Sequence, residues 1–447
     1  MRFWKEKNKV AKEYTREEIE DIIEENKRLS LENKSMQKVL QSKRFRAAEK
    51  IANTFNVVFP EHSPQRAALK GLYSPVRKIK KSRNESTIRK TEKLAKSFEK
   101  IVVMHSIPWN TPLKQRPQHL AQCLSEKGIF VIYLEPDEPI HGFRKVSSNF
   151  VTTNNWETIF NLKLNEKSKY YFFFNNVSNI EFSVIEKIKS KGYNIVYEYI
   201  DEFHEDISGS MLNQLETWEK LPTLKPLVLA SADKLYKEAE KHFKDCKVIM
   251  SKNAVVAEDF DYHNFTETEA PEDLIPILKN KQPIVGYYGA LAPWLDYKLI
   301  SDSAKNNPKL NFVYLGVNYQ NALQNLDQDL KNLYYLGPKK YTDLPKYSSF
   351  FDCAIIPFGT GEIAKGTSPV KLFEYMAMGL PTVGTRDLRE CAGFNHVYLA
   401  KTHEEFSELL KKAIKERKSD SVREELLAQA KKNTWNSRAD DIIEALK

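Results

Sequence analysis

The most informative part of the chain reads GTSPVKLFEYMAMGLPTV, residues 366–383. Its first four residues are typical of a loop that leads into a helix with a proline near the first turn. The free N–H groups and the positive dipole at such a helix start favour a phosphate. Lys371 in the first turn can neutralise that phosphate, and Glu374 on the same face can accept two hydroxyl hydrogen bonds. The pattern therefore fits a diphosphate and a ribose, with an ordinary capped helix as the alternative.

On both sides of this stretch, from about residue 100 onward, short apolar runs alternate with amphipathic segments. This alternation predicts parallel β/α units. The predicted strands of the first half are 101–105, 130–134, 170–174, 194–199 and 227–230, with a helix at 115–127. Those of the second half are 284–288, 311–315, 333–335, 353–356 and 382–384. Two doubly wound sheets in one chain imply a cleft where the carboxyl ends of their strands face each other.

A longer sequence string around this helix is more specific than the lysine and glutamate alone. Residues 369–383 match P-x-K-L-(F/Y)-E-Y-(L/M)-A-x-G-x-P-V-V, with Thr382 in place of a valine. In this string the chain resembles GT-B glycosyltransferases, closest to the bacterial family 4 and family 1-like enzymes that build surface polysaccharides. GYYGALAPWLD (286–296) resembles the first strand and glycine turn of their donor domain, and GPKKYTDLP (337–345) resembles the loop that borders the nucleobase. The resemblance covers about residues 100–447.

The resemblance implies an α/β chain with the GT-B fold, in which two Rossmann-like doubly wound domains face a cleft, preceded by a helical coiled-coil segment. The expected parts are a coiled-coil helix (1–50), a basic linker or helical segment (51–98), an acceptor domain (99–257), a hinge (258–282), a donor domain (283–425) and a closing helix that returns to the acceptor domain (426–447).

The donor site is implied residue by residue. Glu374 is expected to bind the donor ribose, and Lys371 to offset the charge on the departing nucleoside diphosphate. The other donor-binding residues expected from the resemblance are Gly289, Ala290, Gly337, Pro338, Thr367, Ser368, Pro369 and Val370. Such enzymes usually work without a bound metal, so we expect neither a metal nor a cofactor.

One position departs from the family. Many retaining members carry a further glutamate eight residues before the ribose-binding one, but that position is Gly366 here, and the nearby Glu362 is out of register. The sequence therefore leaves open whether the reaction retains or inverts the anomeric configuration.

The acceptor side is marked by a Trp…Arg-Pro-x-His-Leu arrangement after the first strand, which recurs in related transferases. Trp109, Arg116 and His119 follow the first predicted strand, and the loop that leaves a parallel strand there faces the cleft. Arg116 is expected to reach the diphosphate or an anionic acceptor. An ion pair at a helix start for Arg116 and a packed imidazole for His119 are the alternatives.

A catalytic base is expected after another predicted strand, in YEYIDE (197–202). Asp201 lies where related enzymes often have an acid, and in an inverting reaction its carboxylate could deprotonate the acceptor hydroxyl. Glu198, His204 and a plain helix cap at Asp201 are the alternatives.

The expected activity is transfer of a sugar from a nucleotide-diphosphate sugar to a growing surface glycan or a lipid-linked acceptor. One alternative is a nucleotide-sugar epimerase of the same fold. The other is a catalytically degenerate coiled-coil scaffold, suggested by Gly366. The sugar, the nucleobase, the acceptor and the linkage depend on loops outside the shared motif.

The first hundred residues hold the basic excess of the chain, with 26 Lys or Arg against 14 Asp or Glu. The segment 66–100 has 12 basic and 3 acidic residues and matches no nucleic-acid-binding motif. A solvated helix face is one interpretation of such a run. An anionic membrane surface is the other, since each Lys or Arg contributes about 1 kcal/mol there.

A heptad pattern precedes this basic segment. Ile19, Asn26, Asn33 and Leu40 recur every seven residues, with a second series at Ile22, Leu29 and Met36. The pattern favours a short coiled coil and a homo-oligomer, whereas a long helix lying on its own domain is the alternative.

The 447-residue chain has no apolar run of about 20 residues, no legible secretory signal and four scattered cysteines. The chain is therefore expected in the cytoplasm.

Overall fold

The computed structural model describes residues 74–111, 114–135, 142–164, 167–175, 180–204, 212–327 and 329–447, with side chains from residue 81 onward. The predicted coiled coil at 1–50 lies outside the described residues. The chain divides into the units Met1–Ser82 and Arg83–Lys447, and the second contains both β-sheets. Helix α4 (Ser74–Ala95) ends in this second unit, where its buried Thr91 and Ala95 pack under the first sheet.

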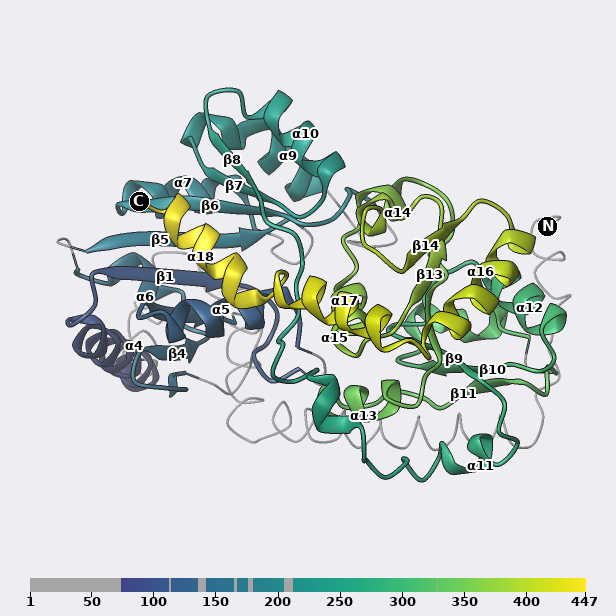
Figure 1. The fold of residues 1–447 in the computed structure, drawn as a ribbon. Helices are drawn as coiled ribbons and strands as arrows, with labels where there is room; N and C mark the ends of the chain where they lie inside the picture. The colour runs from purple at the N-terminus through teal and green to yellow at the C-terminus, as the bar shows by residue number, and fades with distance from the viewer. Residues whose placement is uncertain are drawn as a thin grey trace, which may run out of the picture. The chain divides into compact units, whose positions relative to one another are not determined.

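The first sheet has eight strands in the order β3-β4-β2-β1-β5-β6-β7-β8, and only β3 runs antiparallel to its neighbour (Figure 1). The strands are β1 (Lys100–His105), β2 (Phe130–Leu134), β3 (Arg144–Lys145), β4 (Phe150–Thr153), β5 (Ser168–Phe174), β6 (Tyr193–Tyr199), β7 (Leu227–Ala230) and β8 (Lys247–Met250).

Helices cover both faces of this sheet, which explains why its central strands are continuous apolar runs. Along β1, Ile101 and Val103 belong to one buried cluster, whereas Val102 and Met104 belong to the cluster on the other face. The helices of this half are α5 (Arg116–Glu126), α6 (Glu157–Asn161), α7 (Phe182–Ser190), α9 (Leu212–Lys220) and α10 (Asp233–His242).

The second sheet has six parallel strands in the order β11-β10-β9-β12-β13-β14, the arrangement of a dinucleotide-binding fold. The strands are β9 (Ile284–Tyr288), β10 (Asn311–Leu315), β11 (Leu333–Tyr335), β12 (Cys353–Ile356), β13 (Thr382–Thr385) and β14 (Val397–Ala400). Its helices are α11 (Ile275–Leu278), α12 (Tyr297–Asn306), α13 (Leu344–Ser348), α14 (Glu362–Gly366), α15 (Val370–Ala377), α16 (His403–Glu416) and α17 (Asp420–Lys431).

All ten predicted strands are present, each within two residues of its predicted bounds, and the two doubly wound sheets are confirmed. Four further strands were not predicted, namely β3, β4, β8 and β14. Strands β8 and β14 are sheet edges whose side chains are half-exposed, so they lack the apolar run that marks a central strand.

The chain crosses twice between the two halves, and the crossings lie side by side. Val255 donates its N–H to Asn433 and accepts one from Trp435, at 3.1 Å each. Helix α18 (Trp435–Ala445) then packs on α5, with Trp435, Ala439 and Ile442 in the core of the first sheet. The expected hinge, 258–282, buries Phe260 among the side chains of the second core.

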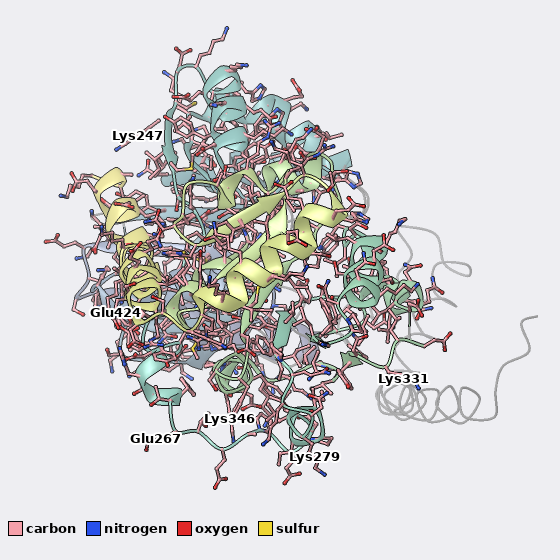
Figure 2. The ribbon with its side chains drawn as sticks, turned by 45° about the vertical axis from the view of Figure 1, so that its right-hand side comes forward. Lys247, Glu267, Lys279, Lys331, Lys346 and Glu424 are labelled. Atoms are coloured by element: carbon pink, nitrogen blue, oxygen red, sulfur yellow. The ribbon has the colours of Figure 1, made fainter. Side chains whose placement is uncertain are left out.

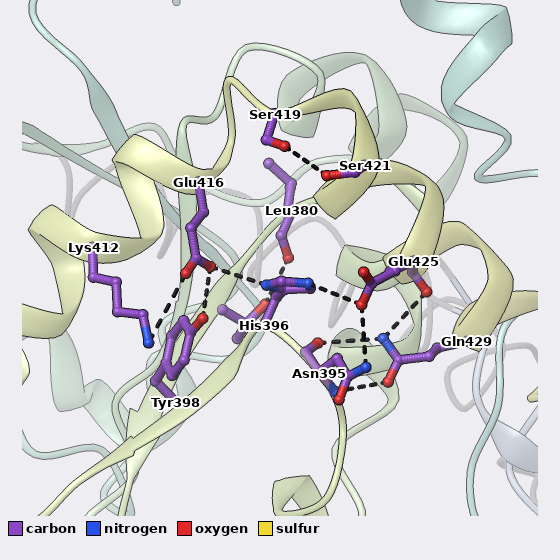
Figure 3. Close-up of polar contacts among 11 residues, drawn as sticks. Leu380, Asn395, His396, Tyr398, Lys412, Glu416, Ser419, Ser421, Glu425 and Gln429 are labelled. Carbon is purple, nitrogen blue, oxygen red and sulfur yellow. Dashed lines mark hydrogen bonds and ion pairs between the residues drawn. The ribbon is translucent and has the colours of Figure 1, made fainter.

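A polar cluster fixes the start of the edge strand β14 against the two helices beside it (Figure 3). His396 contacts Glu416 at 3.1 Å through Nδ1 and Glu425 at 3.3 Å through Nε2. The Tyr398 hydroxyl donates to the same Glu416 carboxylate at 2.6 Å. Because these residues lie where the strand begins, the opposite end of the sheet stays available for a ligand.

The surface of the molecule carries exposed lysines. Among them, Lys247, Lys279 and Lys331 extend into solvent (Figure 2).

Candidate functional site

A cavity of about 300 Å³ lies where loops after the strands of both sheets meet. The first half contributes residues that follow β1, β6 and β8, and the second half contributes residues that follow β9, β10 and β11 together with the start of α15. Seven of the predicted site residues line it: Arg116, Asp201, Gly289, Pro338, Val370, Lys371 and Glu374. The remaining predicted residues are not among those that line the cavity: Trp109, His119, Ala290, Gly337, Thr367, Ser368 and Pro369.

Lys371 brings a positive charge to this cavity without an ion-pair partner among the described residues. Its Nζ lies 5.4 Å from the ring centre of Tyr287 and 5.2 Å from that of Phe358. Burial beside these rings lowers the pKa of Lys371 to about 8, although the nearby Glu374 carboxylate acts in the opposite direction. An ammonium that is poorly solvated and unpaired gains most from an anionic ligand.

Glu374 lies one turn further along α15 and is 5 % exposed. Burial raises the pKa of Glu374 to about 7, while the Tyr288 hydroxyl and the Lys371 ammonium act in the opposite direction. The carboxyl group and the ammonium thus line one cavity from adjacent turns of one helix. This arrangement can hold a hydroxyl-bearing group and a phosphate side by side.

Two glycines let the backbone come close to Lys371. A side chain at Gly289 would place its Cβ 2.9 Å from Lys371 Cε, so the alkyl chain of the lysine lies over this glycine. A Cβ at Gly316 would lie 1.7 Å from the Gly289 carbonyl oxygen. Gly316 also donates its N–H to the Gly337 carbonyl at 3.0 Å. Gly337 therefore helps to hold together the loops that follow β9, β10 and β11, although it does not line the cavity.

Arg116 is the N-terminal residue of α5 and is 3 % exposed. Its guanidinium contacts the Glu198 carboxylate through Nε at 2.9 Å and through a terminal nitrogen at 2.8 Å. It also donates to Ser251, to the Lys252 carbonyl and to Asn253. The structure thus places Arg116 in a buried ion pair with Glu198, the alternative interpretation, while the residue also lines the cavity. Burial raises the pKa of Glu198, and the charge of Arg116 opposes this shift.

Asn253 was not predicted as a site residue, and it ties the first half of the chain to the loop that precedes α15, where a phosphate was predicted to bind. Its side-chain amide donates to the Ser368 carbonyl at 2.6 Å, and its backbone N–H donates to Ser368 Oγ at 3.3 Å. Asn253 also lines the cavity. Its partner is 115 residues away in the sequence, so no local pattern could have indicated this contact.

Asp201 stands at the end of β6, as predicted. Asn175, at the end of β5, donates to the Asp201 carbonyl at 2.7 Å and accepts from the Ile200 N–H at 2.9 Å. These bonds fix the corner of the chain from which Asp201 reaches the cavity. Asp201 therefore lines the same cavity as Lys371 and Glu374 but comes from the other half of the chain. A carboxylate in that position can act as a base on a hydroxyl bound in the cavity.

His119 and Trp109 lie away from the cavity lining. The His119 ring stacks on Trp435 at 5.1 Å and 8°, and burial lowers its pKa to about 3. Trp109 packs edge-on against Tyr133 and Phe150, at 5.3 and 4.7 Å. The packed imidazole that was the alternative for His119 is what the structure shows.

The structure explains why position 366 is a glycine. A Cβ there would lie 2.5 Å from the Glu202 carboxylate, which comes from the other half of the chain. Glu202 pairs with Lys234, and Lys234 pairs with Glu362 at 2.8 Å. The space that a glutamate at 366 would need is therefore filled by a carboxylate from the first half.

No group of three or more His, Cys, Asp or Glu side chains in the described ranges is arranged to hold a metal ion. The spacing Asp-x-Asp does occur at 259–261 and at 327–329, but neither pair belongs to such a group. Cys123, Cys246, Cys353 and Cys391 are free thiols. Similarly, none of the helices within the described part of the chain combines 18 residues of length with enough apolar character to cross a bilayer.

The comparison of sequences agrees with this geometry. Residues 272–434 match the family described as Glycosyl transferases group 1. A Bacillus subtilis (strain 168) protein, TuaH, whose name assigns it to teichuronic acid biosynthesis as a glycosyltransferase, is 29% identical over 163 residues. That similarity covers 35% of this chain and 40% of TuaH, so it spans less than half of the relative.

The comparison of structures extends over more of the chain. Sucrose-phosphate synthase from Thermosynechococcus elongatus superposes with a TM-score of 0.55 at 11% identity, covering 77% of this chain and 98% of that one. Anabaena Alr3699/HepE in complex with UDP-glucose gives 0.55 at 13% identity, covering 77% and 99%. With the two facing sheets already described, these similarities show that the chain has the GT-B fold and that its residues 272–434 are similar to the group 1 glycosyl transferases.

Proposed function

We propose that this protein transfers a sugar from a nucleotide-diphosphate sugar to a growing surface glycan or a lipid-linked acceptor, without a bound metal. The main observation behind the proposal is that Lys371 and Glu374 lie on one helix face, inside a cavity that both halves of the chain line. The UDP-glucose bound to Alr3699/HepE supports the donor class, and the name of TuaH supports an envelope polysaccharide as product.

In the proposed reaction, the Lys371 ammonium stabilises the negative charge that grows on the leaving diphosphate. Glu374 accepts hydrogen bonds from the ribose hydroxyls, and Gly289 provides backbone next to the phosphates. Asp201, on the opposite side of the cavity, accepts the proton of the attacking hydroxyl if the reaction inverts. Arg116 holds the cavity wall through Glu198 and positions Asn253 against the phosphate loop.

A panel of nucleoside diphosphates tests this proposal. At about a hundredfold excess over its Kd, a nucleotide that binds only the folded protein stabilises it by about 2.7 kcal/mol. For a domain of this size, the thermal midpoint then rises by about 5–10 °C. We expect such a shift for at least one of UDP, GDP, ADP and CDP. A flat response to all four contradicts the proposal.

The products formed with and without an acceptor distinguish a glycosyltransferase from a nucleotide-sugar epimerase. Incubation with an acceptor glycan and the sugar nucleotide that matches the best diphosphate yields released diphosphate and an extended glycan if the protein is a transferase. An isomerised sugar nucleotide without any acceptor indicates the epimerase instead.

Binding of the nucleotide is expected to weaken at alkaline pH. The pKa of free Lys371 is about 8, and a bound diphosphate raises it because the opposite charge favours the ammonium. Between the free and the bound pKa, binding therefore takes up a proton, and the affinity falls by up to about tenfold per pH unit above 8. Calorimetry in buffers of different ionisation enthalpy measures this proton uptake directly.

Lys371→Arg is the control for this pH dependence, since a guanidinium stays charged throughout the range. The variant is expected to lose the proton uptake at pH 9 even if its affinity is lower. Equal uptake in both proteins would assign the proton to a different group and contradict the predicted role of Lys371.

The first hundred residues suggest where the reaction takes place. We propose that the basic segment 66–100 attaches the protein to an anionic membrane surface and that the heptads at 19–40 form a homo-oligomer. Flotation with vesicles of phosphatidylcholine alone, or with added phosphatidylglycerol, tests the first part at physiological salt. Equal retention on both kinds of vesicle contradicts it.

A further inference from the structure

Beside the cavity, the structure exposes apolar side chains that no catalytic role requires. Val317 is 42% exposed and Tyr319 is 37% exposed, although large apolar side chains are rarely this exposed in the described part of the chain. Val317 also lines the cavity. The Trp294 ring lies 5.6 Å from the Tyr319 ring, so an aromatic pair stands next to Val317. Clustered exposed apolar groups indicate a binding surface, whereas single ones do not.

The backbone holds this surface, which we call the rim, in a fixed position. Leu291 donates its N–H to the Val317 carbonyl and accepts one from Tyr319, at 2.9 Å each. The Trp294 carbonyl accepts the Gly359 N–H at 2.7 Å. The rim, residues 291–294 and 317–321, therefore consists of two loops joined like short strands. A joined pair of loops can present its rings at little cost in conformational entropy.

The next two residues have a left-handed backbone conformation, which is rare for glutamine, whereas asparagine adopts it more readily than most residues with a side chain. Gln320 has φ 51° and Asn321 has φ 58°, both in the left-handed region. For a residue with a side chain, this conformation costs about 1–3 kcal/mol, and such strain is concentrated where a ligand is bound. Gln320 and Asn321 are both exposed, so the turn presents two amide side chains beside the aromatic pair. The Asn321 amide is held in place by its neighbours, since it accepts from Asn318 at 3.3 Å and donates to Gln324 at 3.5 Å.

The rim is also uncharged in a chain in which 29% of the residues carry charge. No Asp, Glu, Lys, Arg or His occurs in residues 283–295 or in residues 310–326. Aromatic rings offer an apolar face, and amides offer one acceptor and two donors each. A neutral sugar ring has the matching chemistry, because its C–H face is apolar and its hydroxyls both donate and accept.

From these observations we infer that the rim binds a neutral sugar unit of the acceptor glycan, with Tyr319 as the stacking platform and Gln320 and Asn321 as hydrogen-bonding partners. The inference rests on the proposed function and extends it: the carboxy-terminal half holds part of the acceptor as well as the donor. It also specifies the acceptor, since an anionic sugar finds no countercharge on the rim.

Binding of oligosaccharides to the full chain tests the inference. The probes are cellohexaose, maltohexaose and chitohexaose as neutral glycans and oligogalacturonate as a charged one. Saturation-transfer NMR is recorded with the best nucleoside diphosphate present. We expect binding of at least one neutral probe, with an affinity that Tyr319→Ala lowers by about threefold to tenfold and Tyr319→Phe preserves. Leu215→Ala, another exposed apolar position, is the matched control and leaves binding unchanged.

Every other outcome overturns the inference. Absence of binding to all neutral probes, preference for oligogalacturonate, or equal binding by Tyr319→Ala each assigns the rim to a different partner. The nucleotide-induced thermal shift of Tyr319→Ala is measured on the same samples. If the variant keeps that shift, its loss of oligosaccharide binding is due to the rim alone. A wild-type protein without any nucleotide-induced shift contradicts the proposed function itself.

Discussion

Replacing Lys371 with alanine lowers the rate of sugar transfer by about 10²- to 10³-fold, the usual loss when one preorganised charge-stabilising group is removed. The ammonium has no ion-pair partner among the described residues, and it lies over Gly289 at the cavity. Its charge is therefore not neutralised by a direct ion pair and can act on the diphosphate. Single-turnover rates with the preferred sugar nucleotide measure the effect, because they exclude product release.

The stability of the folded protein separates this role from a structural one. Lys371→Ala removes the packing of an alkyl chain and two cation–π contacts, but it also relieves the cost of burying an ammonium whose pKa is lowered by burial. The two effects oppose each other, so the free energy of unfolding changes by only about 1 kcal/mol. The surface variant Lys331→Ala is the control for removing a positive charge from the same domain. If Lys371→Ala retained full activity, the assignment of the phosphate site to α15 would be wrong.

Replacing Gly316 with alanine is expected to destabilise the carboxy-terminal half by about 3–5 kcal/mol. The new Cβ would lie 1.7 Å from the Gly289 carbonyl oxygen, which is backbone and cannot rotate away. Overpacking and an unfavourable backbone conformation each contribute about 1–3 kcal/mol. The midpoint of thermal unfolding falls by roughly 10 °C, and nucleotide binding weakens because Gly289 is displaced.

Gly361→Ala is the matched control for Gly316→Ala. The two glycines have nearly the same φ, 144° and 149°, but a Cβ at Gly361 has no atom within 4 Å. The control therefore contains the conformational strain without the steric conflict, and it is expected to lose only about 1–3 kcal/mol. Equal loss in both variants would show that the close approach to Gly289 is unimportant.

The sequence predicted the central strands well because each is buried on both faces and therefore reads as a continuous apolar run. It also predicted the helix that carries Lys371 and Glu374, since a loop with proline, a cation and a carboxylate have fixed spacing within one turn. These features are local, and local features survive in a single sequence.

What the sequence could not reveal are contacts between residues far apart in the chain. Arg116 meets Glu198 82 positions later, and Asn253 meets Ser368 115 positions later. The strand β4 was missed for a different reason, since it ends in two threonines that are buried although their side chains are polar. The rim was missed because Trp294 and Val317 belong to separate loops, which the pairing of β9 with β10 and the bonds of Leu291 bring together.

The contact between Gly366 and Glu202 has a consequence for how relatives of this protein diverge. Because the Glu202 side chain occupies the volume where a side chain at 366 would begin, any residue larger than glycine at 366 requires the Glu202 side chain to move or to be shorter, so the two positions are sterically coupled. An evolutionary lineage could thus pass an acidic group from one half of the molecule to the other, while a column-by-column alignment would score the exchange as two unrelated mutations.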